Sequence, residues 1–320
     1  MSSEHTAHRE KPIDPNTLSL KEFAEHLRQG DLVERLLKLA HDEDLGPEGR
    51  DWTGQLMFKP DSTRKVQLNT REAGVLAGTA FIPDLLRVFC PNGDVECRTY
   101  IGDGARIEVG ACIASLKGNA RSIVKLERTM LNLLSRMCGI ATRVHSFVEL
   151  VKQTNTKICD TRKTTPGLRV FEKYAVRCGG GHTHRMGLYD AVLIKDNHIA
   201  GLSSDQLATS LRHTAYELLE SGARLQFVQV EVDTLEQLQA VLTAGSGIVE
   251  IILLDNMAPD VLAEAVALRD QQGSSVLLEA SGGVTEKTVT AIAQTGVDRI
   301  SIGGLTHQAQ SLDLGLDAVS

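Results

Sequence analysis

The sequence is poor in aromatic residues, which make up 4% of its 320 residues. So few rings argue against a stacking platform for single-stranded nucleic acid. No run of 18 apolar residues occurs, which argues against a membrane-spanning helix, and residues 1–16 contain no apolar core of a secretion signal. The basic residues form no uninterrupted run and the formal net charge is -7, so we expect neither nucleic acid nor membrane as a partner.

Cysteine is sparse and scattered. The six cysteines are Cys90, Cys97, Cys112, Cys138, Cys159 and Cys178. None of them forms a CxxC pair, and reduced, buried thiols are favoured over a disulfide framework. We therefore expect a cytoplasmic protein.

Basic residues gather instead in one stretch, residues 160–198. Its members are Arg162, Lys163, Arg169, Lys173, Arg177, Arg185 and Lys195, with His182, His184 and His198 among them. Because the chain as a whole is acidic, a local cluster of cations predicts a site for a strongly anionic small molecule.

The first part of the chain groups its elements by type. Residues 1–16 are polar, and we expect a disordered leader. Apolar residues at helical spacing predict one or two helices over residues 18–39, and a loop follows at 42–53. Strand-like runs separated by turn residues occur at 65–69, 74–79, 95–101 and 111–116. This grouping indicates an α+β domain over roughly residues 17–118.

A long amphipathic helix is predicted over residues 119–154, with Asn119 as its N-cap. Gly139 is expected to bend it or to let another backbone approach. One polar stripe runs along it, and from periodicity alone this stripe is a solvated face. The stripe consists of Lys125, Arg128, Asn132 and Ser135.

After residue 156 strands and helices alternate. Strand-like runs lie at 157–159, 191–194, 227–232, 249–254, 275–278 and 299–302, and helical segments lie at 205–220, 235–242, 259–271 and 286–294. Alternation predicts a parallel sheet or barrel, possibly of fewer than eight units. The absence of a GxGxxG turn after the first strand weakens a dinucleotide-binding fold.

In a barrel the carboxyl ends of the strands carry the chemistry. In chain order these ends offer Arg162 and Lys163, Lys195, Glu231 and Asp233, Asp255 and Asn256, Ser281 with Gly282 and Gly283, and Gly303 with Gly304. Arginine clamps carboxylates and phosphates, carboxylates hold ribose hydroxyls or Mg²⁺, and glycine turns expose N–H groups to a phosphate. Together they predict a ligand with a phosphate, a sugar and further negative charges.

Several segments go beyond such general patterns. They are ERTMLNLLSRMCGIAT from position 127, DTRKTTPG from 160, GHxHRMGLxDxxLIKxNH from 181, VEVD from 230, LLDNM from 253, EASGGV from 279 and SIGGLTH from 301. In these segments the chain resembles the quinolinate phosphoribosyltransferase family, also called carboxylating nicotinate-nucleotide pyrophosphorylases. The resemblance implies an N-terminal α/β sandwich over residues 17–137 and an incomplete parallel α/β barrel over 138–320, whose C-terminal tail can pack back on the first domain.

The resemblance also implies a reaction and an assembly. Phosphoribosyl pyrophosphate and quinolinate would give nicotinate mononucleotide, pyrophosphate and CO₂ in NAD biosynthesis, with Mg²⁺ as the cofactor. The protein would be a homodimer in which Arg128 reaches into the active site of the partner subunit. Arg128 would then not belong to a solvated face. Quinolinate would be bound by Arg128, Arg162, His184 and Arg185. Lys163 and Lys195 would hold pyrophosphate, Glu231 and Asp255 the ribose and Mg²⁺, and Ser281, Gly282, Gly303 and Gly304 the 5′-phosphate.

Other functions stay open at this point. Lys195 at a strand end suits a Schiff-base aldolase, and His182, His184 and His198 suit a metal-dependent hydrolase. A non-catalytic anion-binding protein is a third possibility. Within the transferases, nicotinate or the unknown substrate of a molybdenum-transport-linked group could replace quinolinate.

Overall fold

The computed structural model describes residues 12–195, 198, 201–245 and 247–319. The chain divides into two compact units. We call residues 1–17, 149–162 and 183–302 the barrel unit, and residues 18–148, 163–182 and 303–320 the sandwich unit. Residues 1–11 of the expected leader, and Asp196 and Asn197 beside Lys195, lie outside the described residues.

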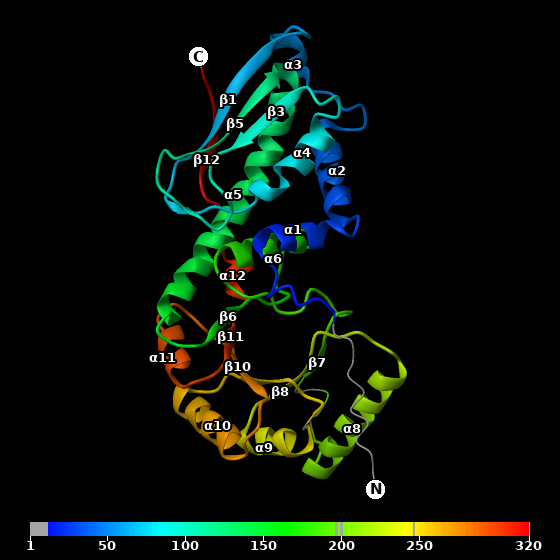
Figure 1. The fold of residues 1–320 in the computed structure, drawn as a ribbon, viewed down its shortest axis with the longest axis vertical. Coiled ribbons are helices and arrows are strands. Elements are labelled where there is room, and N and C mark those ends of the chain that lie inside the picture. Colours follow the sequence, from blue (N-terminus) through cyan, green and yellow to red (C-terminus); the bar gives the residue numbers. More distant parts are fainter. Residues whose placement is uncertain (1–11, 196–197, 199–200, 246, 320) are drawn as a thin grey trace. The chain divides into compact units, whose positions relative to one another are not determined.

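The sandwich unit is built on an antiparallel sheet with the strand order β12-β1-β5-β3 (Figure 1). These strands are β1 (Thr63–Thr70), β3 (Val95–Thr99), β5 (Cys112–Asn119) and β12 (Leu314–Ala318), and a two-stranded sheet pairs β2 (Gly74–Val75) with β4 (Arg106–Ile107). Along β1 the buried positions are Val66, Leu68 and Thr70. This period of two buries one face of the strand, as the alternating sequence predicts.

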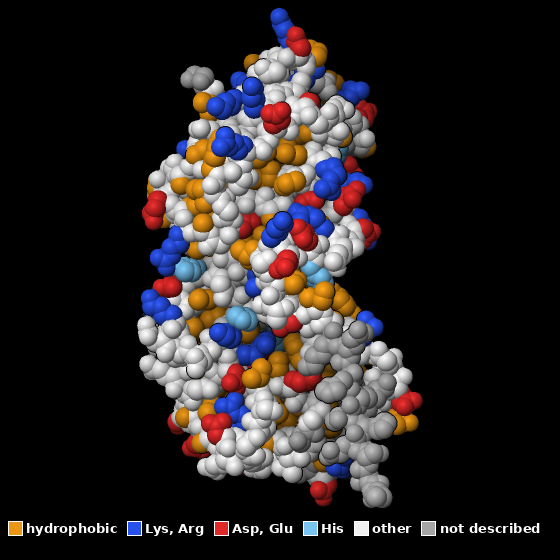
Figure 2. All heavy atoms as spheres, in the orientation of Figure 1, with side chains coloured by type: hydrophobic (Ala, Val, Ile, Leu, Met, Phe, Trp, Pro, Cys, Tyr) orange, Lys and Arg blue, Asp and Glu red, His pale blue; other side chains and the backbone are white. Residues whose placement is uncertain are grey.

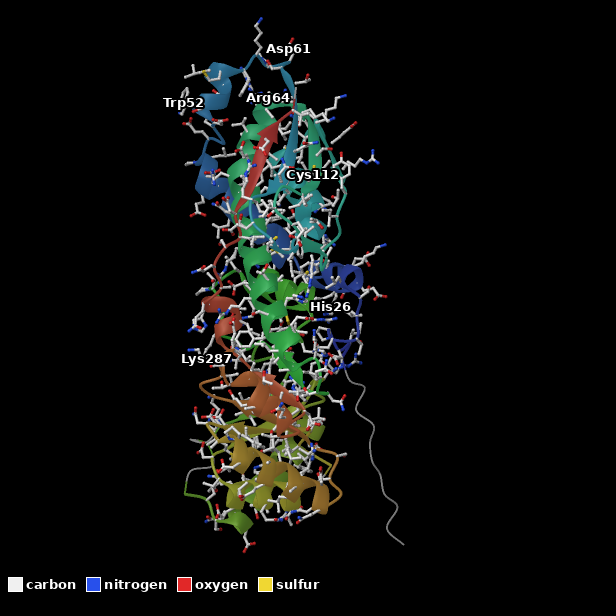
Figure 3. The ribbon with its side chains drawn as sticks, turned by 90° about the vertical axis from the view of Figure 1, so that its left-hand side faces the viewer. His26, Trp52, Asp61, Arg64, Cys112 and Lys287 are labelled. Atoms are coloured by element: carbon white, nitrogen blue, oxygen red, sulfur yellow. The ribbon has the colours of Figure 1, made fainter. Side chains whose placement is uncertain are left out.

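Helices accompany this sheet. They are α1 (Leu20–Arg28), α2 (Leu32–Leu45), α3 (Trp52–Met57), the short 3₁₀ turn η1 (Thr79–Phe81), α4 (Ile82–Phe89), α5 (Ala120–Val151), α6 (Arg169–Cys178) and α12 (Gly304–His307). Helix α5 belongs to this unit as far as Val148. The loop expected over 42–53 is wrong at both ends, because α2 continues to Leu45 and α3 begins at Trp52. The Asp51 side chain caps α3 by accepting a hydrogen bond from the Gly54 N–H. This cap is hard to recognise in the sequence because the whole segment is rich in acidic residues. Trp52 projects from α3 and is 62% exposed (Figure 3).

The long helix α5 confirms two expectations. Asn119 Oδ1 accepts hydrogen bonds from the main-chain N–H groups of Arg121 (3.0 Å) and Ser122 (3.2 Å), which is the geometry of an N-cap. At Gly139 another backbone does come close, because a Cβ there would collide with the main chain of Gln310. This close approach lets the C-terminal segment lie along α5 on its way to β12.

The barrel unit contains a six-stranded sheet with the order β6-β11-β10-β9-β8-β7, and every neighbouring pair is parallel. Its strands are β6 (Lys157–Cys159), β7 (Val192–Ile194), β8 (Val228–Val232), β9 (Ile251–Asp255), β10 (Leu277–Ser281) and β11 (Arg299–Ser301). Helices α8 (Ser204–Glu220), α9 (Leu235–Ala244), α10 (Pro259–Gln271) and α11 (Val289–Gln294) lie on the outer side of the curved sheet (Figure 1). The expected fold class, an α/β sandwich with an incomplete parallel barrel, is confirmed.

Alternation along these strands separates two environments. In β8 the valines at 228, 230 and 232 are 0–2% exposed, and Gln229 and Glu231 lie between them. The register places Glu231 opposite Leu253 and Leu253 opposite Glu279, so these carboxylates share one face of the sheet. One face is therefore aliphatic, while the other carries buried polar groups. Among the described residues no helix is both long and apolar enough to cross a membrane.

Candidate active site

The carboxyl edge of the barrel sheet gathers several predicted residues. Asp255 and Ser281 end β9 and β10 and lie opposite each other in the register. Lys195 directly follows β7, and Glu231 is the penultimate residue of β8. Since all these strands are parallel, their carboxyl ends meet at one edge, where α/β enzymes bind their ligands.

Lys195 and Glu231 form an ion pair across this edge. Lys195 Nζ lies 3.5 Å from Glu231 Oε2, and the two side chains are 49% and 10% exposed. Asp255 accepts a hydrogen bond of 2.7 Å from Asn256 Nδ2. A half-exposed ammonium group beside a nearly buried carboxylate can hold an anion and a hydroxyl group side by side.

The positive charge of Arg162 acts on the buried side chain of Arg185. The Arg185 side chain is buried, and its Nη1 donates to the Ala191 carbonyl at 3.2 Å. Burial and then the charge of Arg162 lower the pKa of Arg185, with Asp190 acting in the opposite direction. Two guanidinium groups held together in this way are stabilised by an anion that accepts from both.

His184 is fixed by partners on both sides of its ring. Nδ1 accepts from the Arg185 N–H at 2.8 Å, so the proton of a neutral ring lies on Nε2. Nε2 lies 2.8 Å from Gln229 Oε1 and 3.4 Å from Glu279 Oε1. A ring whose two nitrogens are engaged is not a zinc ligand, which removes His184 from the alternative hydrolase. No group of three or more His, Cys, Asp or Glu side chains in the described part of the chain is placed to hold a metal.

Behind His184 lies a buried ion pair that sequence reasoning missed. Arg299 Nε donates to Glu279 Oε2 at 2.7 Å, and the Glu279 side chain is fully buried. Burial opposes the charge of Glu279, yet His184 and Arg299 hold the pKa of this carboxyl well below its ordinary value. The pair gives the polar face of the sheet a fixed anion next to the histidine.

A glycine turn follows β10. Gly282 and Gly283 have φ angles of 94° and 58°, in the left-handed region that favours glycine. Asn256, itself at φ 53°, donates its N–H to the Ser281 carbonyl at 2.9 Å, and its side chain fills the space that a Cβ of Gly282 would need. The two glycines add no side chain of their own beside Ser281.

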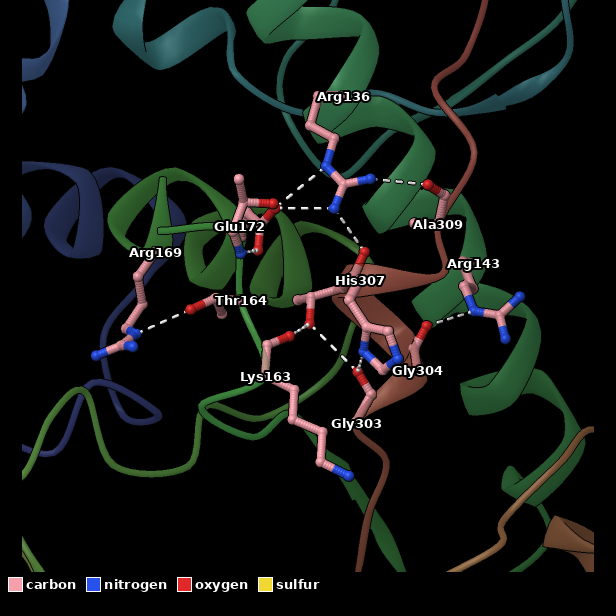
Figure 4. Close-up of polar contacts among 12 residues, drawn as sticks. Arg136, Arg143, Lys163, Thr164, Arg169, Glu172, Gly303, Gly304, His307 and Ala309 are labelled. Carbon is pink, nitrogen blue, oxygen red and sulfur yellow. Dashed lines mark hydrogen bonds and ion pairs between the residues drawn. The ribbon is translucent and has the colours of Figure 1, made fainter. Parts of the chain in front are cut away.

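The sandwich unit holds a second group of predicted residues (Figure 4). Thr306 Oγ1 donates to the Lys163 carbonyl at 2.6 Å, and a Cβ on Gly303 would lie 2.6 Å from Lys163 Cδ. Arg143 Nε donates to the Gly304 carbonyl at 2.8 Å, and His307 Nδ1 lies 2.8 Å from the Gly303 carbonyl. Lys163, Arg143 and His307 thus surround one glycine pair.

This glycine pair is braced from α5 and α6. Arg136 makes two bonds of 2.9 and 3.1 Å to Glu172 Oε1, and it also donates to the carbonyls of Thr306 (2.7 Å) and Ala309 (2.8 Å). The Glu172 side chain is 1% exposed. A fork of planar donors shared between a carboxylate and two carbonyls holds the end of α12 and the residues that follow it in one position (Figure 4).

Arg128 lies elsewhere in the sandwich unit. It is exposed on α5 and lines a cavity of about 430 Å³ between α2, α5 and α6. Asn132, from the same polar stripe, and Arg136 also line this cavity. The stripe is therefore a concave, partly basic surface.

The predicted site residues divide between the units. Arg162, His184, Arg185, Lys195, Glu231, Asp255, Ser281 and Gly282 belong to the barrel unit, and Arg128, Lys163, Gly303 and Gly304 belong to the sandwich unit. Arg169, Lys173 and Arg177 of the cation-rich stretch lie on α6, and Lys173 is fully buried there. Arg143 and His307 were missed, although ERTMLNLLSRMCGIAT ends just before the first and SIGGLTH ends on the second. On the face in Figure 2, basic and acidic side chains are interspersed.

Comparisons with known proteins agree with one another. Residues 140–317 match the family described as quinolinate phosphoribosyl transferase, C-terminal domain, and residues 51–138 match its N-terminal domain. A carboxylating nicotinate-nucleotide pyrophosphorylase of Mycobacterium leprae is 41% identical over 290 residues, which is 90% of this chain and 97% of that protein. A probable one of Bacillus subtilis is 37% identical over 285 residues, with 89% and 93% covered. Among solved structures, the nicotinate-nucleotide pyrophosphorylase of Francisella tularensis matches with a TM-score of 0.80 and 34% identity, covering 97% of this chain and all of that one.

Proposed function

The chain belongs to the quinolinate phosphoribosyltransferase family and is a pentosyltransferase of NAD biosynthesis, and from this premise we propose how its own residues work. The substrates are quinolinate and phosphoribosyl pyrophosphate, and the products are nicotinate mononucleotide, pyrophosphate and CO₂. The observation that carries the proposal is the buried guanidinium of Arg185, held by the Ala191 carbonyl, with the positive charge of Arg162 acting on it. Two planar forks suit the two adjacent carboxylates of quinolinate better than the single carboxylate of nicotinate.

In this proposal Arg162 and Arg185 bind the dicarboxylate and His184 sets their geometry. The structure favours an indirect role for His184 over direct binding, because both of its ring nitrogens have protein partners. Its Nδ1 holds the N–H of Arg185, so turning the ring would move the arginine. The role is thus one of positioning.

Phosphoribosyl pyrophosphate is held by glycine turns and by charged side chains. Ser281, Gly282, Gly303 and Gly304 receive the 5′-phosphate through main-chain N–H groups. We add Arg143 and His307 to this set because both hold the glycine carbonyls. Lys163 and Lys195 bind the pyrophosphate, and Glu231 and Asp255 bind the ribose hydroxyls.

The residues fit Mg²⁺ that is bound together with the substrate. Mg²⁺ in phosphate-transferring sites takes one or two carboxylates and completes its shell with phosphate oxygens and water. Glu231 and Asp255 provide such a pair on one face of the sheet. When bound, Mg²⁺ supplies positive charge to the leaving pyrophosphate.

The chemistry needs positioning and charge, and no enzyme nucleophile. The pyridine nitrogen forms a bond to the anomeric carbon while the carbon–oxygen bond to pyrophosphate breaks, and the leaving oxygen keeps the electron pair. Lys163 and Lys195 stabilise this developing charge. The cationic ring then loses its 2-carboxylate as CO₂. The electron pair left on the ring carbon is stabilised by the adjacent nitrogen and takes a proton from solvent.

We also propose a homodimer in which Arg128 completes the partner's quinolinate site. Its exposed place in a concave, partly basic surface supports this role. Arg128→Ala should fold but lose activity, and mixing it with Lys195→Ala should restore some. No recovery, with subunit exchange shown by mass spectrometry, would count against a shared site.

The six free cysteines, four of them buried, support a cytoplasmic location.

The test of the function is CO₂ release from carboxyl-labelled quinolinate with phosphoribosyl pyrophosphate and Mg²⁺. Release should depend on phosphoribosyl pyrophosphate and fall when Mg²⁺ is chelated. Nicotinate, run in parallel, should give no pyrophosphate. Pyrophosphate from nicotinate alone would reassign the substrate, and no turnover of either would point to the molybdenum-transport-linked group or a binding protein.

A further inference from the structure

We propose that residues 12–17, the N-terminal arm, position the loop of residues 183–190 that carries Arg185, and thereby tighten binding of the pyridine dicarboxylate. The inference rests on the proposed role of Arg185. It assigns a function to a segment that lies far from the site in sequence. The hydrogen bonds that carry it join residues of the barrel unit.

Asn16 makes three hydrogen bonds to a single residue of the loop, Thr183. Its Oδ1 accepts from the Thr183 N–H at 2.8 Å and lies 3.2 Å from Thr183 Oγ1, while its Nδ2 donates to the Thr183 carbonyl at 3.0 Å. One amide therefore satisfies both main-chain groups of the residue before His184. A side chain that fixes both the N–H and the carbonyl of a residue fixes the direction in which the chain leaves it.

Gln226 provides a second anchor. Its Nε2 donates to the Ile13 carbonyl at 2.7 Å, and its N–H donates to the Asp190 carbonyl at 2.7 Å. Asp190 in turn accepts from the N–H groups of Met186 (2.7 Å) and Gly187 (2.9 Å). The arm, Gln226 and the closed end of the loop thus form one hydrogen-bonded unit, held at both ends of the Arg185 segment.

Hydrogen bonds within the arm fix its shape. Asp14 Oδ1 accepts from the Asn16 N–H at 2.9 Å, and the Asp14 carbonyl accepts from both the N–H (3.0 Å) and the Oγ1 (2.8 Å) of Thr17. Pro15 is buried, and a second proline stands at 12. Proline and an aspartate-centred turn restrict the free chain, so less conformational entropy is lost on docking.

Docking closes a cavity behind the substrate-binding residues. The cavity has a volume of about 70 Å³, and Asp14, Pro15 and Asn16 form one wall. His184, Arg185 and Arg299 are among the residues on the other walls. Removing the arm would admit water here and free the Arg185 side chain, which is only 9% exposed with the arm in place. Greater freedom before binding weakens binding, because that freedom is lost in the complex.

Steady-state kinetics of Asn16→Ala, with Asn92→Ala as an exposed control, tests the proposal. We expect KM for quinolinate to rise about tenfold, with KM for phosphoribosyl pyrophosphate unchanged and the thermal midpoint within a few degrees of wild type. Asn16→Asp, which keeps the acceptor and loses the donor, should be intermediate. A chain lacking residues 2–11 should behave as wild type, and one lacking residues 2–17 should behave as Asn16→Ala.

Hydrogen exchange of the Thr183, His184 and Arg185 amides separates this proposal from the proposed function, because it needs no substrate. Faster exchange of these amides in Asn16→Ala, together with the selective rise in KM, is the expected result. Unchanged exchange or an unchanged KM for quinolinate would overturn the positioning role, as would an equal rise of both KM values. If the wild-type protein does not turn over quinolinate, the proposed function fails, and exchange alone then decides whether the arm orders the loop.

Discussion

The two units handle negative charge in different ways. In the barrel unit, charged side chains supply the site: Arg162 stands against Arg185, and Lys195 against Glu231. In the sandwich unit, the pair Gly303 and Gly304 leaves main chain accessible and places a lysine against it. The paired N–H donors of a guanidinium group match the shape of a carboxylate. A glycine turn offers main-chain N–H groups to a phosphate and needs only to be free of side chains that would block its approach. Substitutions should therefore fail differently in the two units, through lost charge in one and through added bulk in the other.

The largest effect should come from removing charge in the barrel unit. Arg185→Ala deletes the buried one of the two guanidinium forks, and we expect kcat/KM for quinolinate to fall roughly thousandfold, as for other buried charge pairs. Arg185→Lys should recover only part of this loss, because an ammonium group keeps the charge but not the bidentate geometry. KM for phosphoribosyl pyrophosphate should stay near wild type. The exposed Arg224→Lys is the control, and a full recovery with lysine would show that charge alone suffices.

The next effect concerns pH. The pKa of Glu279 is lowered, so the stability from its ionised form is present above about pH 4.5 and is lost as the pH falls through the lower folded-state pKa. Glu279→Gln leaves Arg299 buried without its partner, and we expect a loss of about 3 kcal/mol at pH 7. Thermal unfolding followed from pH 7 to pH 3 should show the gap between variant and wild type shrinking below pH 4.5. A gap that stays constant, or one equal to that of the exposed Glu264→Gln, would contradict the assignment.

The sequence predicted the helices and strands of the barrel unit better than those of the sandwich unit. Residues 157–159 and 259–271 form a strand and a helix with the expected bounds, because apolar runs and turn residues mark their ends. Helix α6 was missed since it buries Glu172 and Lys173, and charged residues on the inside erase the apolar stripe. Strand β12, with the sequence LGLDA, has no β-branched run and forms only because β1 offers it an edge.

In the site, too, the sequence predicts residues that a local motif marks but not contacts that only the tertiary fold creates. The ends of recognisable strands pointed to Arg162, Lys195, Glu231 and Asp255, and the resemblance to the family pointed to Arg185. The partners of His184 could not be found in this way. Gln229 and Glu279 lie on different strands and meet at the His184 ring, and Arg299, on a third strand, pairs with Glu279, so only the register brings these groups together.

A smaller effect should come from adding bulk in the sandwich unit. Gly303→Ala would place a methyl group 2.6 Å from Lys163 Cδ, so the lysine must move. We expect KM for phosphoribosyl pyrophosphate to rise about tenfold while KM for quinolinate stays unchanged, the reverse of the Arg185 variants. Gly30→Ala, where nothing lies within 4 Å of the new methyl group, is the matched control. Equal changes in both KM values would show that the two sets of residues do not divide the substrates between them.

The smallest effect separates the stabilities of the units. Cys138 in the sandwich unit and Cys159 in the barrel unit are both 0% exposed, and burial raises the pKa of Cys138 to about 12. In the native protein at pH 8 an alkylating reagent should reach only the partly exposed Cys97 and Cys112. In Glu279→Gln, Cys159 should be labelled several times faster than Cys138, because the lost ion pair joins β10 to β11, the strand that pairs with β6. Equal acceleration at both thiols, read by mass spectrometry of the peptides, would mean that the two units open together and that their stabilities cannot be tuned separately.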